Sequence, residues 1–286
     1  MKRLLVLLGL ICIFFTGCSA AEKPAQIAAT TLPVYEFTTR LCEGTGITVT
    51  RLVTENVSCL HDYSLNVRQV RAAEAAETVV ISGAGLEDFM SDILANSKCI
   101  DSSTGLELLH CEHEHGHDHH HEEDSHIWLS PENAKVMAKN ICIGLCAQYP
   151  QHAPAFEANL DALLSDLDAL QTYGEVQLAD LSCRELVSFH DGFGYFADAF
   201  GLTILEAVEE EAGSEASASE LIHLITLVEK HDLPAIFIET NGSVSAADII
   251  SAETGAVVYT LDMAMSGDSY FQAMYYNIDT IKEALG

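Results

Sequence analysis

The sequence predicts an α/β protein of two lobes, each a mainly parallel sheet flanked by helices, with the lobes joined by one long rigid helix. Short apolar runs alternate with amphipathic segments in both halves of the chain, the order typical of parallel sheets covered by helices. Between the halves, residues 153–181 carry apolar side chains at three- and four-residue steps, which is long for an ordinary globular helix. The chain has 286 residues, enough for two modest domains.

The first half contains four predicted strands and three predicted helices. The predicted strands are residues 26–30, 47–53, 78–83 and 98–103. The predicted helices are residues 66–77, 86–96 and 130–149. The start of the last helix is well marked, because Ser130 can cap it, Pro131 suits the first helical position and Glu132 favours the first turn.

The second half repeats the alternation after the long helix. Its predicted strands are residues 185–190, 202–208, 234–240 and 256–262. Its predicted helices are residues 191–200, 217–231, 243–254 and 268–285. The predicted boundaries are a first lobe at 26–149, a linking helix at 150–180 and a second lobe at 181–286.

The N-terminus predicts export and anchoring. Residues 1–17 have two basic residues, an apolar run and small residues before Cys18, which is the pattern of a secretory signal peptide. The ending FTGC resembles a bacterial lipobox, so we expect a lipid on Cys18 and a short tether over 18–25. These features predict a protein held at the outer face of the bacterial cytoplasmic membrane.

Composition excludes several classes of function. The chain carries 43 acidic residues against 13 Lys and Arg, a net charge of −30, so nucleic acid is excluded as a partner. No CxxC pair is present, which argues against a zinc ribbon or a thioredoxin-type site. We predict no particular disulfide, and we expect a monomer.

Four polar residues fall at or after predicted strands, where ligands of parallel sheets bind. They are His61, His126, His190 and Asp262, and the last two end their predicted strands. Three imidazoles and a carboxylate suit tetrahedral Zn²⁺. Taken singly, each could instead be a hydrogen-bonded loop residue or a helix cap. Glu239, which lies at the end of another strand, is the reserve ligand or a carboxylate that supports the ligands.

A histidine-rich segment at 110–124 interrupts the first half. Its alternation of His with Glu and Asp has no apolar anchor and predicts a loop without a packed core. The segment could collect zinc weakly and pass it on, or it could bind metal incidentally, and both interpretations stay open. Its histidines are His110, His113, His115, His117, His119, His120 and His121.

Four long segments carry a family resemblance. HDYSLNVRQV, DSHIWLSPENAKVMAKNI, SFHDGFGYFADAFGL and LDMAMSGDSYFQAMYYNIDTIKEAL resemble, in order, the signature segments of the bacterial metal-binding lipoproteins that deliver zinc or manganese to ABC transporters. The resemblance covers nearly the whole chain after the signal peptide. It implies two α/β lobes with metal in the cleft between them, and a permease in the cytoplasmic membrane as partner.

Carried over by position, the family's ligands fall on His61, His126, His190 and Asp262. Manganese-dedicated members tend to have Glu where this chain has His190, so the resemblance favours Zn²⁺ over Mn²⁺. The function expected is capture of Zn²⁺ without chemistry. Manganese uptake or surface adhesion on the same fold is the alternative, and a zinc hydrolase is disfavoured because none of the predicted helices carries an HExxH motif.

Overall fold

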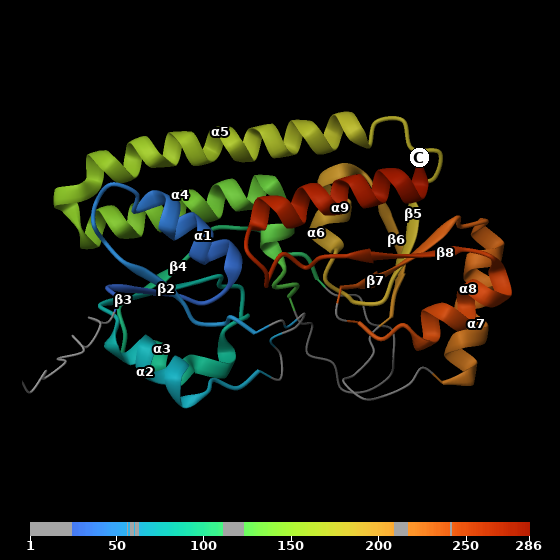
Figure 1. Ribbon diagram of the computed structural model, residues 1–286, viewed down its shortest axis with the longest axis horizontal. Coiled ribbons are helices and arrows are strands. Elements are labelled where there is room, and N and C mark those ends of the chain that lie inside the picture. Colours follow the sequence, from blue (N-terminus) through green and yellow to red (C-terminus); the bar gives the residue numbers. More distant parts are fainter. Residues whose placement is uncertain are drawn as a thin grey trace, which may run out of the picture.

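Two four-stranded parallel sheets form the centres of two lobes that lie side by side (Figure 1). The first has the order β2-β1-β3-β4 and the second the order β6-β5-β7-β8, so the two-lobed α/β prediction is confirmed. The strands are β1 (Ile27–Ala29), β2 (Val49–Arg51), β3 (Thr78–Ile81), β4 (Cys99–Asp101), β5 (Glu185–Ser188), β6 (Thr203–Ala207), β7 (Ala235–Glu239) and β8 (Val257–Leu261). This computed structural model describes residues 25–55, 57, 60, 63–110, 123–208, 217–240 and 242–286.

Helices cover the sheets and connect the strands in parallel order. They are α1 (Leu32–Leu41), α2 (Val67–Ala75), α3 (Ser91–Leu94), α4 (Pro131–Gln148), α5 (Ala153–Gln177), α6 (Gly194–Phe200), α7 (Ala218–His231), α8 (Ser245–Thr254) and α9 (Tyr270–Leu285). Three short 3₁₀ helices are η1 (Asp88–Met90), η2 (Ile127–Leu129) and η3 (Pro150–His152). Within the described part of the chain, none of the helices combines the length and the hydropathy that a membrane span requires.

Two helices differ from the sequence-based expectation. The helix α1 was not predicted, because its sequence is rich in β-branched and aromatic residues, and Thr31 before it forms no side-chain cap. Burial of Val34, Phe37 and Leu41 stabilises it instead. In place of the helix predicted over 86–96, the structure has η1 followed by the four-residue α3, and Glu87, just before η1, is buried.

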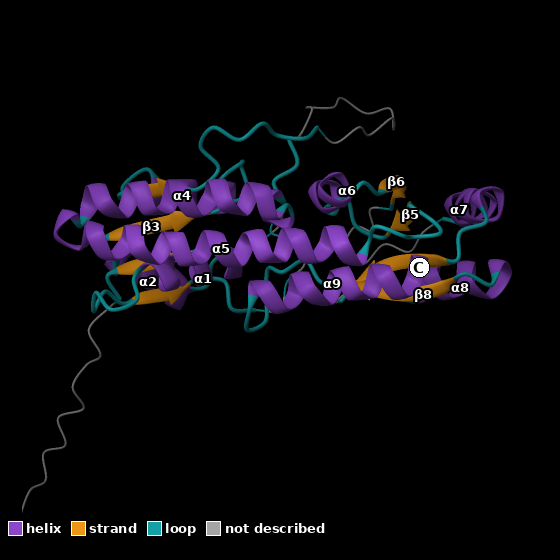
Figure 2. Cartoon of the chain, turned by 90° about the horizontal axis from the view of Figure 1, so that it is seen from above, coloured by secondary structure: helices purple, strands orange, loops and turns teal. Residues whose placement is uncertain are grey.

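The long helix α5 runs along both lobes (Figures 1 and 2). It contacts α1 and α4 of the first lobe and α9 of the second. Phe156, Leu163, Leu167 and Leu170 form its buried stripe. Near its end, a Cβ on Gly174 would lie 2.2 Å from the Phe200 ring, so the absence of a side chain there lets α6 pack directly against α5.

The segment between β8 and α9 ties the lobes together. The buried Trp128 of η2 donates its indole N–H to the Met263 carbonyl at 2.7 Å. The Tyr270 hydroxyl donates to the Trp128 carbonyl at 2.8 Å. On the outer side, Arg51 donates to the Gly267 carbonyl at 2.8 Å. Both lobes therefore share one buried core at this segment.

Glu87 is a buried carboxylate at the carboxyl end of the first sheet. Its Oε1 accepts hydrogen bonds from the Thr30 hydroxyl at 2.6 Å and the Ser82 N–H at 2.8 Å. Its Oε2 accepts from the Gly83 N–H at 3.0 Å. Burial raises its pKa from 4.5 to about 7 against the lowering effect of these hydrogen bonds. The folded state therefore favours the protonated form of Glu87.

We predict that Glu87 makes stability fall as the pH rises. Because its folded-state pKa lies above the unfolded value, its favourable contribution is complete below pH 4.5 and is lost as the pH passes about 7. The free energy of unfolding of wild type minus that of Glu87→Gln should decrease by roughly 3 kcal/mol between pH 4 and pH 8. Urea denaturation at several pH values measures this difference, and the exposed Glu74→Gln is the matched control. Parallel pH profiles for wild type and Glu87→Gln would contradict the prediction.

Candidate metal centre

His126 lies immediately before η2, on the side of the first lobe that faces the second lobe. Its side chain is only 3% exposed. The Asp124 Oδ1 atom accepts the His126 backbone N–H at 2.8 Å and lies 2.8 Å from its ring Nδ1. A carboxylate at Nδ1 favours the tautomer with the proton on Nδ1, which leaves a lone pair on Nε2.

His190 comes from the second lobe, just beyond β5. The strand predicted to end at His190 ends at Ser188, whose hydroxyl donates to the His190 carbonyl at 3.0 Å. Ser188 is paired with Phe237 of β7, so His190 lies beside the end of β7. There the Glu239 Oε2 atom lies 3.9 Å from the His190 Nδ1 atom. The imidazole therefore has a carboxylate on the side away from His126.

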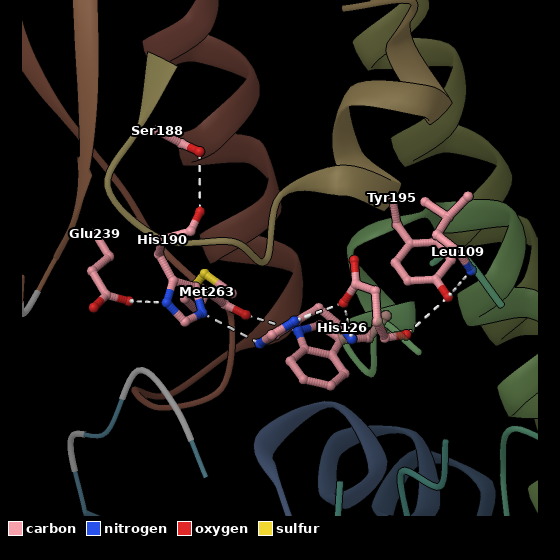
Figure 3. A network of polar contacts seen from close by, with 9 residues as sticks. Leu109, His126, Ser188, His190, Tyr195, Glu239 and Met263 are labelled. Carbon is pink, nitrogen blue, oxygen red and sulfur yellow. Dashed lines mark hydrogen bonds and ion pairs between the residues drawn. The ribbon is translucent and has the colours of Figure 1, made fainter. Parts of the chain in front are cut away.

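The two imidazoles meet with their Nε2 atoms 3.4 Å apart (Figure 3). Their planes are nearly perpendicular, at 87°. Gly192 leaves room at this meeting point, because a Cβ there would lie 2.9 Å from the His190 Nε2 atom and 2.6 Å from the Met263 Cε atom. Two nitrogen donors from different lobes thus converge on one small space.

The predicted ligand Asp262 lies one residue beyond β8, at the same sheet edge as Glu239, because Glu239 pairs with Leu261. Its Oδ1 atom accepts the Ala264 N–H at 2.7 Å. Burial raises the pKa of Asp262, and the hydrogen bond from Ala264 partly opposes this rise. Ligation by Asp262 stays a prediction, and Glu239 is the carboxylate that lies near the His190 imidazole, at 3.9 Å.

Other predicted positions lie outside the described residues. These are His61, Cys18 and the histidines from His113 to His121. His110, at the edge of the histidine-rich segment, forms an antiparallel bridge with Glu123. Among residues the structure does describe, no three His, Cys, Asp or Glu side chains are grouped closely enough to hold a metal ion.

Asp124 and Tyr195 are residues of the site that the sequence reasoning missed. The Tyr195 hydroxyl of α6 accepts the Leu109 N–H and donates to the Asp124 carbonyl, both at 2.9 Å (Figure 3). Asp124 could have been identified from the sequence, since an Asp two residues before a predicted ligand can accept the backbone N–H of that ligand. Tyr195 had none, because its partners are 71 and 86 residues away along the chain.

The comparison with protein families identifies the chain. The model of the zinc-uptake complex component A, described as periplasmic, matches residues 27–284. The chain belongs to this family.

The relatives agree with the match. The zinc-binding lipoprotein AdcA of Streptococcus pneumoniae serotype 4 is 29% identical over 307 residues, which cover 99% of this chain and 61% of AdcA. The zinc-binding protein AdcA of Streptococcus pyogenes serotype M3 is 28% identical over 98% of this chain and 61% of its own length. The chain therefore spans about three fifths of the length of these relatives.

Solved structures of zinc-uptake component A proteins share the fold. A crystal structure of ZnuA has 30% identity and a TM-score of 0.81, with 92% of this chain and all of that chain covered. The Zn(II)-bound ZnuA-like domain of Streptococcus pneumoniae AdcA has 27% identity and a TM-score of 0.77, with 91% and 98% covered. The two-lobed architecture with both sheets is thus that of the family.

We predict that Tyr195→Phe destabilises the protein. Removal of the buried hydroxyl leaves the Leu109 N–H and the Asp124 carbonyl without this partner, which costs about 1–3 kcal/mol in the free energy of unfolding. Chemical denaturation measures the loss. The matched control is Tyr276→Phe, whose exposed hydroxyl contacts Thr260 and should cost about 0.5 kcal/mol or less. Equal losses in both variants would contradict the prediction.

Proposed function

We propose that this protein captures Zn²⁺ outside the cytoplasm and delivers it to an ABC permease in the cytoplasmic membrane. The observation that carries the proposal is the 3.4 Å separation of the His126 and His190 Nε2 atoms. Two nitrogen ligands of one tetrahedral zinc ion, each at ~2.05 Å, lie about 3.3 Å apart. The two imidazoles therefore need little movement to share one ion.

The proposed ligand set combines residues from both lobes. His126 and His190 supply two nitrogen donors, His61 the third, and Asp262 the oxygen donor, with Glu239 in reserve. A nitrogen-rich set favours Zn²⁺ over Mn²⁺, which prefers oxygen donors. A site closed by four protein ligands suits capture and release of an ion, and no chemical step is part of the proposed role.

The family supports the transport role. Its model is named for zinc uptake, and the AdcA relatives are named as zinc-binding. Delivery requires a permease, and a lipid on Cys18 would keep the protein beside it. We propose this anchor from the N-terminal sequence, and the lipoprotein name of the pneumococcal relative supports it.

The test is zinc titration of purified protein and of histidine variants, by competition with a chromogenic chelator. We expect His126→Ala and His190→Ala each to raise the zinc dissociation constant at least 100-fold, because each removes a nitrogen donor. His223→Ala is the matched control, since this histidine is 59% exposed and pairs with Glu206 on the surface. A change below tenfold in both site variants, or equal effects in all three, would refute the proposed site.

A second prediction concerns the histidine-rich segment. Deletion of 111–122 spares His110, Glu123 and Asp124, which the structure places in the bridge and beside His126. We expect the deletion to remove weak zinc sites and to leave the tightest dissociation constant unchanged, in the same chelator titration. Loss of the tightest site would mean that the segment supplies a ligand.

A further inference from the structure

Asp124 lies outside the helices and strands, yet both its side chain and its backbone are held by hydrogen bonds. Its side chain is 6% exposed, and its Oδ1 atom accepts the backbone N–H of His126 and lies 2.8 Å from the ring Nδ1 of the same residue. One oxygen atom therefore sets both the position of the His126 backbone and the rotation of its ring.

The backbone of Asp124 is held on both sides. Its N–H donates to the Leu109 carbonyl at 2.8 Å, and its carbonyl accepts the Tyr195 hydroxyl at 2.9 Å. The same hydroxyl accepts the Leu109 N–H. Because Tyr195 belongs to α6 of the second lobe, both lobes contribute to the position of this one carboxylate.

The second carboxylate oxygen is also confined. A Cβ on Gly194 would lie 3.1 Å from the Asp124 Oδ2 atom, a contact tighter than ordinary van der Waals packing. The absence of a side chain at Gly194 leaves just enough space for the carboxylate. Asp124 thus lies between His126, just before η2, and α6, with its Oδ1 atom beside the His126 ring.

We infer that Asp124 is a positioning residue for metal capture: it holds His126 with the proton on Nδ1, so that the Nε2 lone pair faces His190 before any ion arrives. This inference rests on the proposed function. A ring without this acceptor can carry its proton on Nε2 instead, which is the atom that must bind the ion. The protein then has to move that proton before zinc can bind.

The inference predicts a graded response in two variants. Asp124→Ala removes the acceptor and should raise the zinc dissociation constant 10- to 100-fold, the range typical of lost support for a ligand. Asp124→Asn keeps a neutral oxygen at the same place and should restore most of the affinity. Glu206→Gln is the matched control, because it removes the carboxylate partner of the exposed His223 and should leave the affinity unchanged.

The deciding readout is the tautomer of His126 in the metal-free protein, from the ¹⁵N resonances of the ring at a fixed pH near neutrality. We expect a protonated Nδ1 and an unprotonated Nε2 in wild type and in Asp124→Asn, and a protonated Nε2 in a substantial fraction of Asp124→Ala. A role confined to holding the loop would lower stability without changing the tautomer.

The outcomes separate the two claims. Wild type that fails to bind zinc overturns the proposed function. Wild type that binds zinc while Asp124→Ala keeps its affinity within threefold overturns the inference alone. Wild-type protein with its His126 proton on Nε2 also overturns the inference and needs no variant, so the result does not depend on whether Asp124→Ala folds.

Discussion

The hydrogen bond from the Trp128 indole to the Met263 carbonyl is the interaction on which the site depends. Trp128 lies two residues after His126, and the Met263 side chain lies beside Gly192, close to His190. The bond therefore connects the surroundings of these two histidines, the proposed ligands, across the boundary between the lobes. Both groups are buried, so its loss would leave an indole N–H without this acceptor in the core, at a cost of about 1–3 kcal/mol.

The two imidazoles of the site differ in burial and in the distance to a neighbouring carboxylate. His126 is buried and tied to Asp124 at hydrogen-bond distance, whereas His190 is 16% exposed and lies 3.9 Å from Glu239. The first lobe thus offers a prepared nitrogen donor and the second a more adjustable one. Nearby, the raised pKa of Asp262 reports the cost of a desolvated negative charge, which a cation held between the lobes would offset.

The architecture could be predicted from the sequence, because the periodicity of the apolar residues and the alternation of strands and helices along the chain together determine it. Both sheets, their parallel connections and the long α5 followed from alternating apolar runs and turn signals. The helix α1 did not, since long-range burial overrides its weak local propensity. Strand ends were placed one or two residues late, because polar residues that follow a strand were counted as part of it: His190 lies two residues beyond β5 and Asp262 one residue beyond β8.

The site was predictable only where its residues follow strands or precede a marked helix. His126 and His190 were found by that rule, and the structure brings them together. Asp124 could have been found from its spacing to His126. Tyr195 depends on the packing of α6 against η2, which no local pattern encodes. Contacts between segments far apart in the chain thus limit what can be inferred from sequence.

The last helix of the chain receives part of its cap from the first helix. The Glu36 carboxylate of α1 accepts the Tyr270 N–H at 2.6 Å, at the beginning of α9, where helices leave N–H groups without partners. At its other end, the Leu285 carbonyl accepts the Ser182 N–H at 3.0 Å. A fragment of residues 181–286 would start α9 without that carboxylate. The start of a helix that belongs to the second lobe is therefore completed by a residue of the first lobe, so the two lobes are not structurally independent.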